Sequence, residues 1–138
     1  MDFEFLLKKS EQNIEAAELL ISNKFYASSV HCSYYSCLQL MTYIVLTEDV
    51  MTESQLEKSK RSHEDLITIT YDFLRERTDD FYESRQIKNK ISDAKGSRKR
   101  ADYQNSEIDL VMSEKVFKEM KEVNAKLVKI FKIERYDD

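Results

Sequence analysis

Apolar residues recur at three- and four-residue steps over most of the chain, and this spacing predicts amphipathic helices. Clear stripes of this kind occupy Phe3–Asn23, Ser62–Arg77 and the segment that begins at Ser113. Strands would instead require alternation of apolar and polar residues, bounded by frequent turn residues. The chain contains no proline and a single glycine, so it has few positions suited to sharp turns. The pattern therefore predicts an all-α protein.

The segment 24–47 differs from these stripes, because large apolar side chains cover almost its whole circumference. It carries no charge between Phe25 and Thr47, and small serine and alanine residues are interspersed among the large ones. A helix that is apolar all round is buried all round. The alternative, a membrane span, needs ~20 predominantly apolar residues, and the hydroxyl groups and His31 argue against it. We therefore predict a central helix on which the other helices pack.

The remaining segments have weaker patterns. Residues 48–61 are polar and without clear period, which predicts a loop with at most one turn of helix. Residues 79–97 predict a shorter fourth helix that Gly96 ends or bends, followed by a basic turn. Residues 106–111 are expected to connect this turn to a last helix capped by Ser113. The 138 residues then form one domain (1–138), an up-and-down bundle of four to five helices.

Charge and cysteine content restrict the function and the compartment. A formal net charge of −4 excludes a globally basic nucleic-acid-binding protein, but not a local basic patch. Cys32 and Cys37 would lie roughly 140° apart around one helix, so they cannot bond to each other. Free thiols are typical of a reducing compartment, and acidic residues stand where a secretory signal would be basic. We expect a cytoplasmic protein that does not enter the membrane.

Several kinds of chemistry lack the residues they need. There is no HExxH or CxxC motif, so we expect no metal site, and a single glycine excludes a glycine-rich phosphate loop. A cysteine paired with His63 could serve as a nucleophile, but a catalytic thiol needs an exposed electropositive setting, and buried cysteines are the favoured interpretation. His31 lies one turn before Tyr35, and we interpret it as a hydrogen-bonded interior or interface histidine.

The strongest local signal is the stretch KGSRKRADY, residues 95–103. Lys95, Arg98, Lys99 and Arg100 fall within six positions and are followed at once by an aspartate and a tyrosine. Arginine offers planar bidentate donors that suit phosphate, and tyrosine can stack on a base. The alternative is a solvated cationic turn in which Asp102 pairs with an arginine for structural reasons. The residues alone leave both interpretations open.

Three segments together resemble the HEPN domain family. Phe25–Met41 resembles its second helix, with a Tyr-Ala start followed by a Tyr-Tyr pair, and Ser62–Ile67 resembles the Ser/Thr-His start of its third helix. Arg98–Tyr103 is similar to its Arg-x-x-Ala-Asp-Tyr motif, and the three segments follow in the family's order. The resemblance implies a HEPN-like helical bundle that forms a homodimer, has a role linked to RNA or nucleotides and needs no cofactor.

Many members of that family are metal-independent endoribonucleases of toxin–antitoxin or phage-defence systems, found beside nucleotidyltransferase-like partner proteins. In those enzymes an arginine and a histidine, four to six residues apart, act in a cleft between two subunits. Here Arg98 matches the arginine, whereas Asp102 and Tyr103 stand where the histidine would be. The resemblance therefore implies a dimeric module that binds RNA or a nucleotide through Arg98, Arg100, Asp102, Tyr103 and His63.

Two further hypotheses remain beside the binding module. The first is an endoribonuclease in which Arg98 stabilises the charge that develops on the phosphate, while Tyr103 or His63 transfers protons. The second is a structural helical adaptor whose basic segment is ordinary surface.

Overall fold

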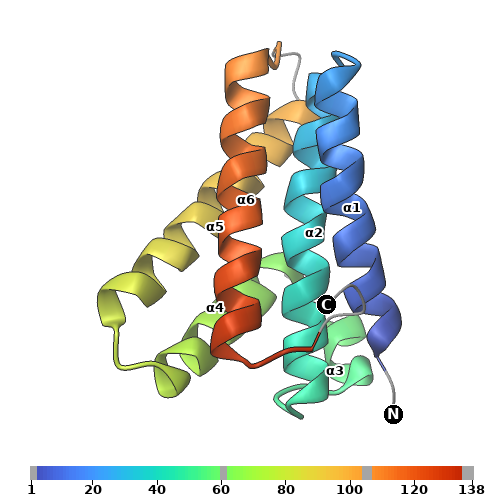
Figure 1. Ribbon diagram of the computed structural model, residues 1–138. Helices are drawn as coiled ribbons and strands as arrows, with labels where there is room; N and C mark the ends of the chain where they lie inside the picture. Colours follow the sequence, from blue (N-terminus) through green and yellow to red (C-terminus); the bar gives the residue numbers. More distant parts are fainter. Residues whose placement is uncertain (1–2, 60–61, 104–106, 135–138) are drawn as a thin grey trace.

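The computed structural model describes residues 3–59, 62–103 and 107–134, and these residues form helices and no strands (Figure 1). The helices are α1 (Glu4–Ser22), α2 (Tyr26–Thr47), α3 (Glu53–Lys58), α4 (Ser62–Arg77), α5 (Phe81–Tyr103) and α6 (Leu110–Ile130). The prediction of an all-α helical bundle is confirmed. The six-residue α3 falls in the segment that the sequence predicts to be mainly loop, and its N-cap Thr52 forms a capping box with Gln55.

Helix α2 is the centre of the bundle, as its apolar circumference predicts. It contacts α1, α4, α5 and α6, and twelve of its residues are buried, among them Tyr34 and Met41. Figure 1 shows α1, α2 and α6 side by side, whereas the connection between α4 and α5 extends away from them at the lower left. Within the described part of the chain, neither α2 nor any other helix combines the length and apolar character needed to cross a membrane.

Buried hydroxyl groups hold α2 against its neighbours where the helices approach closely. Ser29 Oγ donates a hydrogen bond to the carbonyl of Ala17 on α1 at 2.8 Å, and Ser10 Oγ donates to the carbonyl of Ser36 on α2 at 2.6 Å. From the other side, Asn124 Nδ2 of α6 donates to Ser36 Oγ at 3.0 Å. The small residues of α2 therefore permit close packing and also satisfy polar groups within the core.

The expected end of a helix at Gly96 is wrong. Helix α5 continues through this residue to Tyr103, and Gly96 does not have a positive φ. The residues that follow Gly96 include good helix formers and no proline, so one glycine does not overcome the propensity of its neighbours. The Arg-Lys-Arg segment is therefore the last part of a long helix rather than a turn.

The start of the last helix also differs from the prediction. Helix α6 begins at Leu110, inside the expected connector, and Asp109 is its N-cap, with Oδ1 accepting from the backbone N–H of Met112 at 2.9 Å. Ser113 lies within the first turn and is buried. Aspartate and serine are both favourable caps, so the sequence pattern alone could not distinguish the two starting points.

Candidate functional site

The side chain of Arg98 lies between α5 and α2, surrounded by tyrosines. It is only 8% exposed, and Nη2 donates to the hydroxyl of Tyr35 at 2.6 Å and to that of Tyr103 at 3.3 Å. The guanidinium carbon is 5.2 Å from the ring centroids of Tyr35 and Tyr103 and 5.8 Å from that of Tyr34. Hydroxyl oxygens and aromatic faces both favour a cation, so together they stabilise a charge that burial would otherwise disfavour.

The carboxylate of Asp102 joins this arginine to a histidine on α2. Asp102 Oδ2 lies 3.0 Å from Arg98 Nε and 2.8 Å from His31 Nδ1. The Arg98 contact is an ion pair rather than an aligned hydrogen bond, because Nε is buried without a hydrogen-bond partner. A carboxylate only accepts, so His31 Nδ1 donates this hydrogen bond, which leaves Nε2 outside the contact with Asp102. The side chain of His31 is 45% exposed, so part of the ring is open to solvent.

The second histidine, His63, lies at the start of α4. Its Nδ1 is 3.0 Å from the hydroxyl of Tyr34, and its ring centroid is 5.9 Å from that of Tyr35. Burial lowers the pKa of His63 below its usual value of 6.5, and the positive charges of Arg98, Lys95 and Lys99 lower it further. His63 is therefore neutral at pH 7 and lies in a positive electrostatic potential.

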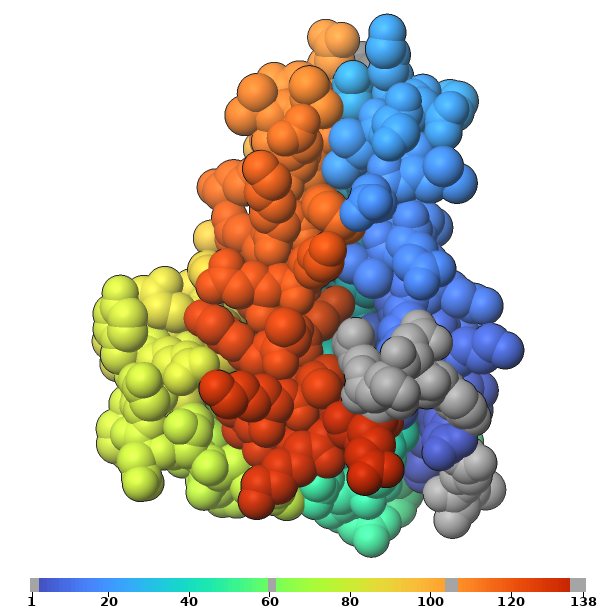
Figure 2. Space-filling model, in the orientation of Figure 1, coloured from blue at the N-terminus to red at the C-terminus, as the bar shows by residue number. Residues whose placement is uncertain are grey.

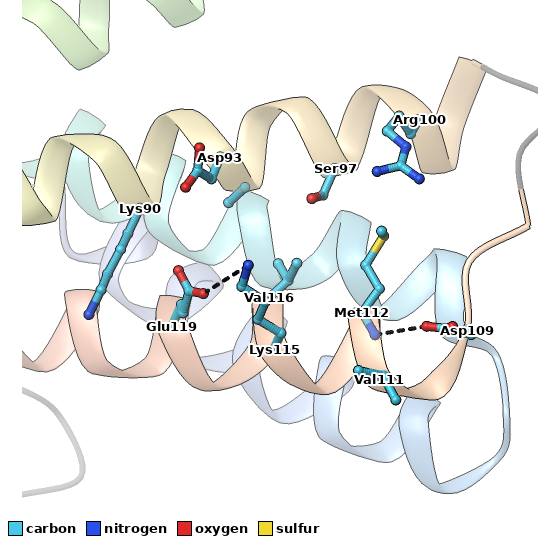
Figure 3. A pocket seen from close by; sticks show the side chains of 11 residues that line it. Lys90, Asp93, Ser97, Arg100, Asp109, Val111, Met112, Lys115, Val116 and Glu119 are labelled. Atoms are coloured by element: carbon cyan, nitrogen blue, oxygen red, sulfur yellow. Dashed lines mark hydrogen bonds and ion pairs between the residues drawn. The ribbon is translucent and has the colours of Figure 1, made fainter.

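These residues form one group, which we call the Arg98 cluster: Arg98, Asp102, Tyr103, His31, Tyr35 and His63. The structure thus brings together four of the five site residues that the sequence suggests. The fifth, Arg100, leaves α5 about 200° further around the helix. It lines a different groove, of about 370 Å³, which lies between α5 and α6 and includes Asp109 and Met112 (Figure 3).

His31 and Tyr35 are the members of the cluster that sequence reasoning missed. Their rings stack with centroids 4.5 Å apart, as their spacing of one helical turn permits. The only sequence signal for this pair was their spacing of four residues on a helix that is otherwise largely apolar. The partner Asp102 is 71 positions away from His31, and no local pattern relates the two residues.

A basic groove begins beside the cluster. Lys95 and Lys99 line it together with Glu64, and it has a volume of about 430 Å³ between α4 and α5. Lys95 Nζ contacts Glu64 Oε1 at 3.2 Å. Across residues 3–59, 62–103 and 107–134, no group of three histidine, cysteine or acidic side chains is arranged to hold a metal ion.

The fold and the site define an all-α bundle whose second and fifth helices enclose a charged aromatic cluster. No model of a known protein family matches the chain, and no curated protein matches it. Functional inference therefore depends on the geometry of the cluster and on the motifs that form it.

Proposed function

We propose that the protein is a HEPN-like module that binds the phosphate groups of RNA or of a nucleotide at the Arg98 cluster. The observation that supports this most directly is the convergence of Arg98, Lys95 and Lys99 around His63, whose pKa falls through burial and through these charges. The protein as a whole carries a formal net charge of −4. A concentration of positive potential on an acidic protein attracts anions to that place.

The members of the cluster have different roles in this proposal. The charge of Arg98 is buried and partly balanced by Asp102, so its main role is to hold Tyr35 and Tyr103 in position. The exposed groups contact the ligand directly. Tyr103 is 73% exposed and offers a ring for base stacking, and the exposed Lys99, which lies beside the cluster, offers a charge for phosphate.

Binding of fluorescently labelled RNA, measured by anisotropy over a range of salt concentrations, tests the proposal. Replacing the exposed Lys99 (Lys99→Ala) should weaken binding about 3- to 10-fold and reduce the salt slope by about 0.7, the value for one phosphate contact of a single strand. Arg100→Ala is the matched comparison, because it removes one charge from the other groove of α5.

Equal weakening by the two substitutions would mean diffuse attraction to the surface and would exclude the Arg98 cluster as the site. Absence of salt-dependent binding would favour the structural adaptor over the binding module.

An endoribonuclease is the second candidate, and the contact between His31 and Asp102 favours it. His31 contacts the carboxylate of Asp102 that also pairs with Arg98, and His63 is another imidazole in the same cluster. Two imidazoles and a guanidinium can supply a base, an acid and charge stabilisation for cleavage without a metal. Labelled RNA incubated with chelator should then be cut by the wild type and not by His31→Ala. RNA that stays intact with both proteins would exclude this activity and leave the binding function standing.

We also propose that the protein forms a homodimer through the end of the bundle nearest the cluster. Four exposed apolar side chains, between 41% and 75% accessible, belong to the segments that meet at this end: Leu19, Phe25, Leu110 and Val111. The end is the narrow upper part of Figures 1 and 2. A wild-type mass of one chain by light scattering at micromolar concentration would contradict the dimer, whereas a dimer that Val111→Glu dissociates would support it. A nucleotidyltransferase-like partner protein is the alternative occupant of this surface.

A further inference from the structure

One side of α5 carries a stripe of positive charge that is longer than the Arg98 cluster. Its residues recur at steps of three and four, so they share one face of the helix. They are Phe81, Arg85, Lys88, Ser92, Lys95 and Lys99, of which four are cations and none is acidic. Four of them line the groove between α4 and α5. The stripe therefore extends the positive charge near His63 along this groove, toward the corner at the lower left of Figure 1.

Aromatic rings lie at the far end of the stripe. Lys88 Nζ is 4.7 Å from the ring centroid of Tyr71, and the guanidinium carbon of Arg75 is 5.6 Å from the centroids of both Tyr71 and Phe81. Phe81, which belongs to the stripe, is 61% exposed. Cations held over aromatic faces lose less conformational freedom when they bind an anion, which favours affinity.

The single glycine of the chain, Gly96, lies in this groove between Lys95 and Lys99. A Cβ atom added to Gly96 would have no neighbour within 4 Å, and its φ is not positive. Neither packing nor backbone conformation therefore requires glycine here, although glycine weakens a helix relative to alanine. A bare stretch of helix backbone does allow a ligand to approach closely.

We propose that a single strand of nucleic acid follows the groove between α4 and α5, from the Arg98 cluster over Gly96 to the ring of Phe81. This inference rests on the proposed function and specifies its substrate class. The nineteen residues from Phe81 to Lys99 span about 27 Å of helix, enough for a strand on the order of four to eight nucleotides.

Charge and shape favour a single strand over other anions. The phosphates would meet Lys88 and Lys99, while the unpaired bases stack on the exposed rings. Glu64 is the acidic residue among the described residues that line the groove, and it already pairs with Lys95. A mononucleotide would not reach the aromatic end, and a duplex would not offer free bases to Phe81.

The experiment measures the affinity of the intact protein for a length series of oligouridylate, from the dinucleotide to the hexadecamer, by fluorescence anisotropy. Affinity should rise with length up to about the octamer and then level off. Phe81→Ala should weaken octamer binding about 10-fold, the effect of one lost stacking contact, and leave dinucleotide binding unchanged. Lys88→Ala should reduce the salt slope for the octamer by about 0.7.

The substitution Gly96→Ala tests whether Gly96 serves ligand binding or the structure of α5. The melting temperature should rise by about 2–4 °C, because alanine is the better helix former, while octamer affinity should fall. The controls are Phe5→Ala and Lys118→Ala, which remove an exposed aromatic ring from α1 and an exposed charge from α6. Both controls should bind the octamer as the wild type does.

The possible outcomes test three claims: the path along the groove, the binding function of the Arg98 cluster and the single strand as the ligand. Equal affinity for the dinucleotide and the octamer would overturn the path along the groove and leave the Arg98 cluster as the binding site. Failure to bind any member of the series would reject the proposed function and the path together. A duplex that binds as tightly as the octamer, or a polyglutamate of equal charge that competes as well as RNA, would overturn the single strand as occupant.

Discussion

His31 on α2 and Asp102 on α5 are 71 positions apart in the chain, yet Nδ1 and Oδ2 lie 2.8 Å from each other. The same carboxylate oxygen is 3.0 Å from Arg98 Nε. Asp102 therefore connects a buried guanidinium to an imidazole that is 45% exposed. Through this carboxylate, a change at the surface histidine can affect the orientation of the arginine beneath it.

The ion pair between Asp102 and Arg98 should contribute more to the free energy of unfolding than the contact between Asp102 and His31. In double-mutant cycles by urea denaturation, we expect a coupling of about 1–3 kcal/mol between Arg98 and Asp102, because the arginine is buried. Between His31 and Asp102 we expect about 0.5 kcal/mol, since solvent screens the partly exposed pair. Asp102→Asn, Arg98→Met and His31→Asn preserve approximate side-chain size. A larger coupling for the His31 pair would contradict this assignment of roles.

Two buried serines of α2 should respond differently to replacement by alanine. Ser36 Oγ accepts from Asn124 Nδ2 and donates to the carbonyl of Ser33, so Ser36→Ala leaves a buried amide without its partner. We expect a loss of about 1–3 kcal/mol in the free energy of unfolding. Ser33 Oγ is buried without a hydrogen-bond partner, so Ser33→Ala should be neutral or slightly stabilising. Equal losses for both substitutions would show that size, rather than hydrogen bonding, governs these positions.

The stability of the protein should depend on the titration of His63. Its pKa in the folded protein is below the usual 6.5 because of burial and three nearby cations. Between these two pKa values the unfolded chain binds more protons than the folded protein, so stability is present in full above pH 6.5 and falls as the pH drops below it. Urea denaturation from pH 7.5 to pH 5 should reveal this loss, and His63→Gln should reduce it. A profile that is unchanged in the variant would assign the loss to other groups.

The same histidine predicts the pH dependence of RNA binding. A bound phosphate favours the protonated imidazole and raises the pKa of His63 in the complex. Protonation and binding then support each other, so RNA affinity should increase as the pH falls from 7 toward 5. Anisotropy titrations of wild type and His63→Gln test this, and an affinity that is equally pH-dependent in both proteins would exclude His63 as the responsible group.

The two cysteines should react very differently with a thiol reagent in the native state. Burial raises the pKa of Cys37 to about 12, and its side chain is inaccessible. Cys32 is partly exposed, but burial and then the charge of Asp102 raise its pKa as well. Native protein at pH 7.5 should therefore show one slow reactive thiol, which Cys32→Ala removes, and two thiols after unfolding. Fast labelling of both thiols in the native state would mean that the core opens readily.

Much of the fold could be predicted from the sequence, because periodicity is a local property. The apolar circumference of residues 24–47 predicted the central helix, and the stripe of residues 62–77 predicted α4 with the bounds that the structure has. The prediction failed where two local signals competed. Gly96 did not end α5, and Asp109 rather than Ser113 caps α6. In both places the difference in propensity is small, so the surrounding helix and its packing decided.

For the candidate site, the sequence by itself determined the chemistry available and the order of the groups along the chain. The segment Arg98–Tyr103 stood out because charge and aromatic character are visible in a single short stretch. Only the tertiary structure decided which groups meet. It brought His31 to Asp102 and turned Arg100 toward a different groove, because the contacts between helices depend on how whole faces pack and not on the spacing within one segment.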